Sequence, residues 1–114
     1  MPSLDGALHS METQLYKRYA LYQDDSCKLE AEVVSRVAYL HCEVTDWKLS
    51  TARKLYSALK TFLDSCEEKD IVQVYTITPN PRFAEMYGGR FCGYVTYQGK
   101  EYEVFKWDLK FSQT

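Results

Sequence analysis

The sequence predicts an α+β (α/β) fold, in which a mixed sheet packs against one long helix in the middle of the chain. Apolar residues recur at alternating steps of three and four from Leu49 to Cys66, which is the period of an amphipathic helix. Stretches rich in β-branched and aromatic residues lie on both sides of this helix and indicate strands. The 114 residues suffice for one core and not for two, so we expect a single domain over residues 1–114.

The first predicted element is a helix over residues 11–23. Residues 1–8 show no periodic pattern and predict a loosely held start. Ser10 could cap the helix, and the polar run 24–26 would stop it. Its inner face would consist of Met11, Leu15, Tyr16, Tyr19 and Tyr22. This tyrosine-rich face would either lie on the sheet or form a docking surface for a protein.

A pair of adjacent strands is predicted next, because the apolar pattern changes to a period of two after the polar run. The strands cover 27–34 and 37–44, with Ser35-Arg36 between them as a turn. We expect the second strand to be more buried than the first. The first strand could instead continue a helix, since Leu, Ala and Glu favour helices.

The long helix is expected to bury one apolar stripe and to expose a charged face. The stripe consists of Leu49, Ala52, Leu55, Tyr56, Leu59, Phe62, Leu63 and Cys66. Ser50 or Thr51 could cap the start of the helix, although Thr45 and Asp46 offer an earlier cap. The charged run 67–70 marks its end.

A strand over 71–77 follows the long helix and ends in the turn 78–81, which contains two prolines. A connection that contains a whole helix permits a parallel pair of strands. We therefore expect 37–44 and 71–77 to be parallel neighbours, with the long helix packed across them.

A short helix is predicted after this turn. Pro81 suits its first turn, and Asn80 could cap it. Its inner face would consist of Phe83, Met86 and Tyr87. Gly88-Gly89 would end it, because glycine takes the left-handed conformation that closes helices.

The C-terminal part of the chain predicts a β-hairpin. Residues 91–97 and 100–109 are both strand-like, and Gln98-Gly99 between them is a hairpin signal. Residues 110–114 predict a frayed end.

Charge and hydropathy argue against two classes of partner. The formal net charge is -2, and no run of Lys or Arg is longer than the pairs at 17–18 and 53–54, so we expect no nucleic acid partner. No apolar stretch is long enough to span a bilayer, and the start of the chain does not resemble a signal peptide. We therefore expect no membrane partner and a cytoplasmic protein.

The cysteines Cys27, Cys42, Cys66 and Cys92 predict reduced thiols, because they are irregularly spaced and include no Cys-x-x-Cys pair. The same spacing argues against a zinc site, so we expect no metal. His41 next to Cys42 could suggest a base beside a nucleophile. Neighbours on a strand point to opposite faces, however, so these two side chains are not expected to face each other.

Two segments resemble the GNAT N-acetyltransferase family. The stretch from Asn80 to Phe91 is similar to the family's segment of Asn, short helix, Tyr and Gly-Phe. The stretch from Asp46 to Ser50 looks like the start of the long helix in divergent acetyltransferase-like and internal virion proteins of short-tailed bacteriophages. The expected order of elements over residues 37–107 also resembles the later part of that fold. The resemblance implies a GNAT-like mixed sheet with a long central helix, a short second helix and a C-terminal hairpin.

The resemblance also implies a site for acetyl-CoA at the start of the long helix. Its contacts would be Lys48, Ser50, Arg53, Lys54 and Asn80. Tyr87 matches the place of the tyrosine that acts as general acid in many members, although a tyrosine that merely closes the short helix is the alternative. The strand carboxylates of Glu30, Glu32 and Glu43 could act as a base through water.

One departure from the family concerns the loop that holds the pyrophosphate of acetyl-CoA. Members of the family bind it on backbone N–H groups in an Arg/Gln-x-x-Gly-x-Gly/Ala loop, because only glycine lets the backbone approach phosphate so closely. No glycine occurs in this chain from residue 7 to residue 87. The missing glycines favour a function without cofactor chemistry.

Two functions therefore follow from the sequence. The favoured one is a protein-binding module on a GNAT-like scaffold, encoded by a phage and directed at a host or virion protein, with a second copy of the chain as another partner. It would use exposed aromatic residues such as Tyr16, Tyr19, Trp47 and Tyr97. The alternative is an N-acetyltransferase that transfers acetyl from acetyl-CoA to an amine.

Overall fold

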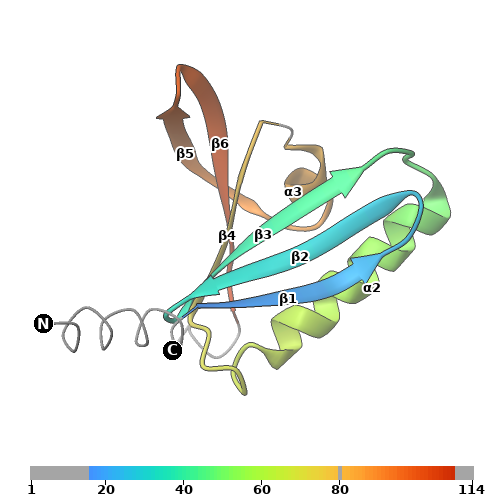
Figure 1. The fold of residues 1–114 in the computed structure, drawn as a ribbon, viewed down its shortest axis with the longest axis horizontal. Helices are drawn as coiled ribbons and strands as arrows, with labels where there is room; N and C mark the ends of the chain where they lie inside the picture. Colours follow the sequence, from blue (N-terminus) through green and yellow to red (C-terminus); the bar gives the residue numbers. More distant parts are fainter. Residues whose placement is uncertain (1–15, 80, 110–114) are drawn as a thin grey trace, which may run out of the picture.

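The computed structural model describes residues 16–79 and 81–109, which form one six-stranded sheet and two helices (Figure 1). The strands are β1 (Tyr16–Gln23), β2 (Cys27–Val34), β3 (Val37–Val44), β4 (Gln73–Thr78), β5 (Arg90–Tyr97) and β6 (Lys100–Trp107), and the helices are α2 (Leu49–Ser65) and α3 (Arg82–Met86). The long helix, the short helix and the C-terminal hairpin confirm the predicted mixed α+β fold. The loose start, the Ser10 cap and the frayed end were predicted for residues outside the described ranges.

The sheet has the strand order β1-β2-β3-β4-β6-β5. β3 and β4 are parallel neighbours, as predicted, and every other neighbouring pair is antiparallel. The prediction that α2 packs across β3 and β4 is wrong in its position, because the helix runs along β1 and β2 (Figure 1). These two strands and the turn between them offer the longer continuous face, whereas β3 and β4 diverge.

Residues 16–23 form a strand, so the helix predicted over 11–23 is wrong for its described part. β1 pairs antiparallel with β2 from end to end, with one bulge. Tyr19 and Leu21 pack against the core at the spacing of a strand. Tyrosine is a good strand former, and pairing with β2 outweighs the helical spacing of the tyrosines.

β2 is the most deeply buried strand of the N-terminal part. Its helix-facing residues, Cys27, Leu29, Ala31 and Val33, are at most 5% exposed. In β3 only Ala38 and Leu40 are buried to this extent. The expectation that the second strand is the more buried is therefore wrong, because β2 lies between two strands while β3 loses its partner β4 partway along. Because β2 is a strand, the alternative that its residues continue a helix is wrong.

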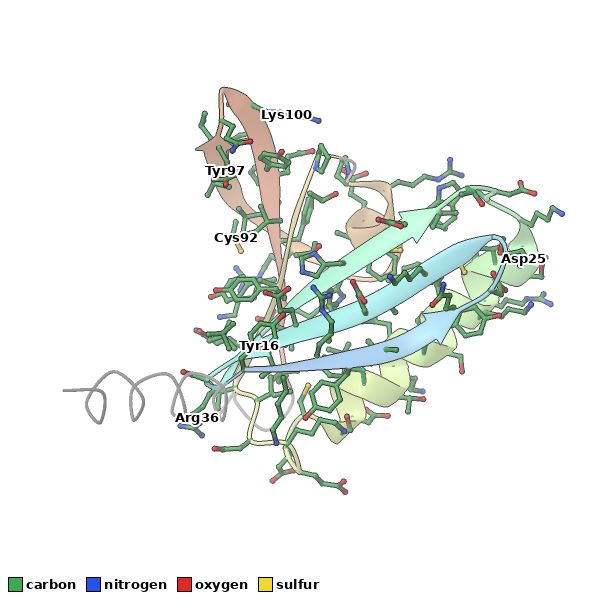
Figure 2. The ribbon with its side chains drawn as sticks, in the orientation of Figure 1. Tyr16, Asp25, Arg36, Cys92, Tyr97 and Lys100 are labelled. Atoms are coloured by element: carbon green, nitrogen blue, oxygen red, sulfur yellow. The ribbon has the colours of Figure 1, made fainter. Side chains whose placement is uncertain are left out.

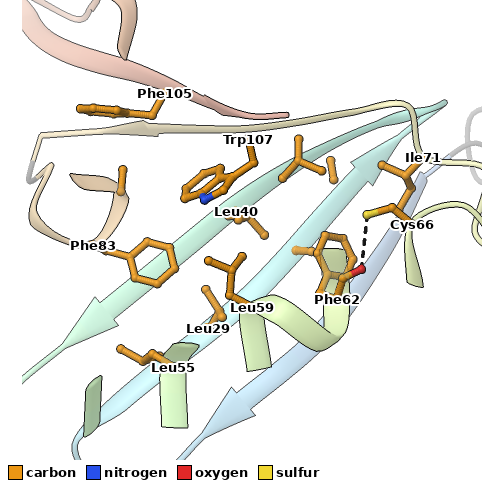
Figure 3. Packing of buried hydrophobic residues seen from close by; sticks show 14 of the residues in the cluster. Leu29, Leu40, Leu55, Leu59, Phe62, Cys66, Ile71, Phe83, Phe105 and Trp107 are labelled. Carbon is orange, nitrogen blue, oxygen red and sulfur yellow. Dashed lines mark hydrogen bonds between the residues drawn. The ribbon is translucent and has the colours of Figure 1, made fainter. Parts of the chain in front are cut away.

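The buried stripe of α2 and its C-cap consists of Thr51, Leu55, Leu59, Phe62 and Cys66, each at most 3% exposed. Figure 3 shows Leu55 and Leu59 on the side of the helix that faces Leu29 of β2. The predicted stripe is confirmed along this line, but Leu49 and Tyr56 are 68% and 51% exposed. Both lie about 100–120° around the helix from Leu55, outside the narrow stripe that the sheet covers.

The start of α2 has no side-chain cap, so the predicted caps are wrong. Lys48 occupies the N-cap position, which places Ser50 and Thr51 inside the first turn. The buried Thr51 hydroxyl instead lies 3.1 Å from the Ser26 hydroxyl in the β1–β2 turn. This hydrogen bond joins the start of the helix to the edge of the sheet.

Gly88 closes α3 with φ of +83°, and the Gly89 N–H donates to the Ala84 carbonyl at 2.8 Å, as the glycine pair predicted. Phe83 and Ala84 are buried, whereas Met86 is 46% exposed and the prediction for it is wrong. A helix of five residues presents only about one turn to the core, and that turn is already filled.

The predicted hairpin turn is present between β5 and β6. Gln98 and Gly99 have φ angles of +52° and +76°, the left-handed pair that suits a two-residue hairpin. β6 ends at Trp107, two residues before the predicted end of that strand. β5 forms the outer edge of the sheet over residues 16–79 and 81–109, because within these ranges it pairs only with β6.

Candidate functional site

β3 and β4 separate toward their carboxyl ends and leave a wedge between them (Figure 1). They pair from Val37 with Gln73 to Tyr39 with Tyr75, although both strands continue further. Just past the last pair, the Thr76 hydroxyl donates to the Leu40 carbonyl at 2.8 Å. A side chain therefore takes the place of the backbone ladder where the β3–β4 wedge begins. In the chain, α2 follows β3 and α3 follows β4, so the helices that carry the predicted site residues come after the strands of this wedge.

Tyr87 links the short helix to the long one. Its hydroxyl donates to the Ala52 carbonyl of α2 at 2.7 Å, and its own carbonyl accepts the Trp107 indole N–H at 2.9 Å. Its ring lies 5.1 Å from the Phe83 ring and 5.9 Å from the Tyr56 ring. Burial raises the pKa of the Tyr87 hydroxyl, so it stays protonated and keeps its hydrogen bond over the neutral range. These contacts indicate a structural role for Tyr87, the predicted general acid, because they join the end of α3 to α2 and to β6.

The two lysines predicted to contact the cofactor are each in an ion pair. Lys48 lies 3.2 Å from Asp46, and Lys54 lies 3.5 Å from Asp24 in the β1–β2 turn. Both lysine side chains are more than half exposed. Their charges are therefore partly balanced within the fold, and Lys54 is directed toward the turn.

Ser50 and Arg53 lie on the exposed side of the first turns of α2. The first helical hydrogen bond runs from the Ala52 N–H to the Lys48 carbonyl at 3.0 Å, so the N–H groups of residues 49–51 precede it. In the described part of the chain, Arg53 has no ion pair. Asn80, the remaining predicted contact, lies outside the described residues.

Asp24 organises the turn beside the start of α2, and the sequence reasoning missed it. Its carboxylate accepts hydrogen bonds from the Tyr22 hydroxyl at 2.5 Å and from the Ser26 hydroxyl at 2.7 Å. It also accepts the N–H groups of Ser26 and Cys27, at 2.8 and 3.0 Å. These bonds, that of Tyr22 first, hold the pKa of Asp24 well below its usual range. The signal in the sequence is Asp24-x-Ser26, which is typical of an Asx turn.

The carboxylates of Glu30, Glu32 and Glu43 lie on the face of the sheet opposite α2. They alternate with the buried residues of β2 and β3, so the sheet separates them from Tyr87. Glu32 lies 3.2 Å from Arg18 and 3.5 Å from His41, and Glu30 lies 3.7 Å from a lysine of the same strand. The structure therefore does not bring a carboxylate base together with the predicted acid.

The four cysteines are free. Burial raises the pKa of Cys42 to about 12 and that of Cys66 to about 11, which keeps both thiols protonated at neutral pH. His41 is exposed while its neighbour Cys42 faces the core side, as the alternation along the strand predicted. Over residues 16–79 and 81–109, the structure contains no group of three or more His, Cys, Asp and Glu side chains that could hold a metal ion. Within the same ranges, no helix is long and apolar enough to cross a membrane.

No protein-family model matches the sequence, and no curated protein sequence matches it either. Solved structures do match the fold. An acetyltransferase from Bacillus cereus ATCC 14579 superposes with a TM-score of 0.56 and 11% identity, over 91% of this chain and 87% of that one. A protein from Agrobacterium tumefaciens, provisionally described as an acetyltransferase, gives a TM-score of 0.53 and 13% identity, over 92% of this chain and 86% of that one. At this identity the likeness shows the fold alone: the chain has a GNAT-type acetyltransferase fold.

Proposed function

We propose that this chain uses the GNAT-type fold as a scaffold for binding another protein and does not transfer acetyl groups. The observation that carries the proposal is the hydrogen bond from the Tyr87 hydroxyl to the Ala52 carbonyl at 2.7 Å. A general acid must direct its proton at the reacting group, and this proton is directed at the backbone of α2. The ring contacts and the Trp107 bond fix Tyr87 in that position.

The start of α2 supports the same proposal, because its residues do not fit the pyrophosphate of acetyl-CoA. A glycine cradle lets backbone N–H groups approach phosphate, but here residues 49–51 are Leu, Ser and Thr. The Thr51 side chain is buried against Ser26, and Leu49 projects into solvent. The charged groups beside them, Lys48 and Lys54, already have acidic partners.

The exposed aromatic residues give the scaffold a binding surface at the C-terminal hairpin. Tyr94 and Tyr97 of β5 are 60% and 64% exposed, and Phe91 is 47% exposed. Figure 2 shows Tyr97 near the projecting tip of this hairpin, away from α2. Among the other aromatic residues that the sequence suggested, Tyr16 is 42% exposed, while Tyr19 and Trp47 are half-buried. Aromatic side chains of this kind often anchor protein interfaces.

The proposed partner is a host or virion protein, because the stretch from Asp46 to Ser50 resembles a segment of acetyltransferase-like and internal virion proteins of bacteriophages. The chain would then act in the cytoplasm of the host cell or in the virion. This part of the proposal depends on the sequence resemblance and on the exposed hairpin together.

N-acetyl transfer from acetyl-CoA is the second candidate, and one observation favours it. The N–H groups of residues 49–51 have no side-chain cap, and the exposed Arg53 lies one turn further along the same helix. Uncapped helix starts beside an arginine attract anions.

Titration calorimetry of the purified protein with coenzyme A and with acetyl-CoA separates the two functions. The proposed function predicts no saturable heat with either compound at millimolar concentration. If a saturable isotherm appears and Arg53→Ala weakens it, the α2 start is a cofactor site and the proposal fails. Lys69→Ala is the matched control, because Lys69 lies beyond the opposite end of α2 and contacts the Tyr19 ring.

A further inference from the structure

β5 is an edge strand that is suited to pairing with another chain. It is eight residues long, and among the residues that the structure describes it pairs with β6 alone. Residues 91–97 contain no charged residue and no proline, which are two of the devices that protect an edge. A bulge is a third such device, but the bulge of β5 lies between Phe91 and Gly93 and leaves the pairing regular from Tyr94 to Tyr97. The outer backbone groups of β5 are therefore available to an added strand.

A bulge in β5 gathers aromatic rings on the helix side of this edge. The register with β6 shifts between Phe91 and Gly93, and Gly93 has φ of +143°. Residues three apart normally point to opposite faces of a strand, but the extra residue brings Phe91 and Tyr94 to the same face. The Phe91 ring lies 5.1 Å from that of Tyr94 and 5.6 Å from that of Phe105, with edge-to-face geometry at both contacts.

These rings line a hollow of about 400 Å³ between the hairpin and the end of α3. Its lining consists of Glu85, Gly89, Phe91, Tyr94, Glu103 and Phe105. The two carboxylates are the only charges in this lining, and within the described residues neither is in an ion pair. Aromatic faces beside carboxylates are the surroundings that bind ammonium and guanidinium groups.

The opposite face of the hairpin differs in this respect. There Lys100 lies 5.8 Å from the Tyr102 ring and Lys106 lies 5.8 Å from the Tyr75 ring. Among the described residues, lysines thus lie over rings on that face, whereas the lining of the hollow contains no lysine or arginine.

We propose that the hollow takes a lysine or arginine side chain from an extended segment of a partner protein, which pairs with the edge of β5. The strand would provide main-chain hydrogen bonds, and the hollow would select the cationic residue. A second copy of the chain fits less well, because residues 91–97 would bring no cation and Arg90 is bound to Asp108 at 3.1 Å. This inference rests on the proposed protein-binding function and names its partner's chemistry.

The test is an NMR titration of the ¹⁵N-labelled protein with two heptapeptides. One is acetyl-Thr-Val-Thr-Lys-Thr-Val-Thr-amide, and the other has norleucine, which keeps the chain but lacks the charge, in place of lysine. We expect saturable shifts of the amides at 91–97 with the lysine peptide and about tenfold weaker binding of the norleucine peptide. The double variant Glu85→Gln, Glu103→Gln should remove this preference. The control Tyr102→Leu, on the opposite face, should keep it.

Three results would overturn the proposal: equal binding of the two peptides, a lysine preference that survives in the double variant, or no binding of either peptide at millimolar concentration. Sedimentation of the free protein provides a further check. A dimer that Tyr94→Leu dissociates would show that a second copy occupies the edge, which also overturns it. No coenzyme A is present in these experiments, so their failure is distinguishable from failure of the proposed function, which the calorimetry decides.

Discussion

The β1–β2 turn and the C-terminal hairpin lie in different parts of the sheet, and they differ in whether the carboxylates beside them have partners within the chain. At the turn, Asp24 accepts four hydrogen bonds at 3.0 Å or less and also lies near Lys54. In the hollow beside the hairpin, Glu103 of β6 and Glu85 of α3 lie near exposed aromatic rings, and the lining contains no lysine or arginine. The first arrangement joins the sheet to α2, and the second leaves its groups available to a partner.

This difference helps to separate structural residues from candidate binding residues. Tyr87 and Lys54 were predicted as site residues, yet each has a partner inside the chain. The strongest candidates for binding lie where the sequence resemblance predicted no site. A hydrogen bond or ion pair within the chain is thus a physical criterion for a structural role, and sequence resemblance alone does not provide it.

The largest expected effect concerns the core beneath α2. Leu59→Ala should lower the free energy of unfolding by about 2–5 kcal/mol, because Leu59 is 2% exposed and its loss leaves a cavity. Lys60→Ala, at the neighbouring exposed position, should change it by less than about 0.5 kcal/mol. Urea unfolding of both variants measures the difference. Equal midpoints would mean that the buried face of α2 is wrongly assigned.

The fold was predictable where local patterns were strong. The period of the long helix, the Gly88-Gly89 stop and the Gln98-Gly99 turn each specify local backbone geometry, and the structure has all three. β1 was not predictable in this way, because its tyrosines match a helical period and become a strand only by pairing with β2. Pairing with another strand is a non-local interaction, so the residues of β1 alone do not predict it.

A second prediction compares two tyrosines. Tyr87→Phe should lower the free energy of unfolding by about 1 kcal/mol, because it removes the hydrogen bond to the Ala52 carbonyl and keeps the ring. Tyr94→Phe should have almost no effect, since that side chain is 60% exposed and its hydroxyl is free to bond with water. Urea midpoints again provide the measurement. A destabilisation by Tyr94→Phe that equals or exceeds that of Tyr87→Phe would contradict the structural role of Tyr87.

The candidate sites were less predictable than the fold, because they depend on partners far apart in the sequence. Nothing near Lys54 indicates that Asp24 lies within 3.5 Å of it. The aromatic hollow also depends on the bulge in β5, because without the extra residue Phe91 and Tyr94 would point to opposite faces of the strand. Gly93 inside a strand was the available signal, since a glycine in that setting often marks a bulge.

The smallest expected effect concerns the pH dependence of stability at the β1–β2 turn. The folded pKa of Asp24 lies below its ordinary value of 3.8, so the ionised carboxylate stabilises the fold fully above about pH 4. This contribution should be lost as the pH falls below that value toward the lower folded pKa. Asp24→Asn should therefore be less stable at neutral pH and should lose less stability than the wild type between pH 4 and pH 2.

Asp25→Asn is the matched control, because the Asp25 carboxylate accepts none of the bonds that Asp24 accepts. Its urea midpoint should follow the wild-type pH dependence. The Arg90–Asp108 pair also holds a carboxyl pKa below its usual range, so part of the acid sensitivity should remain in Asp24→Asn. If the Asp24 and Asp25 variants respond to pH identically, the hydrogen bonds at the turn do not depend on the Asp24 charge, and the contrast with the hairpin is weaker than the structure indicates.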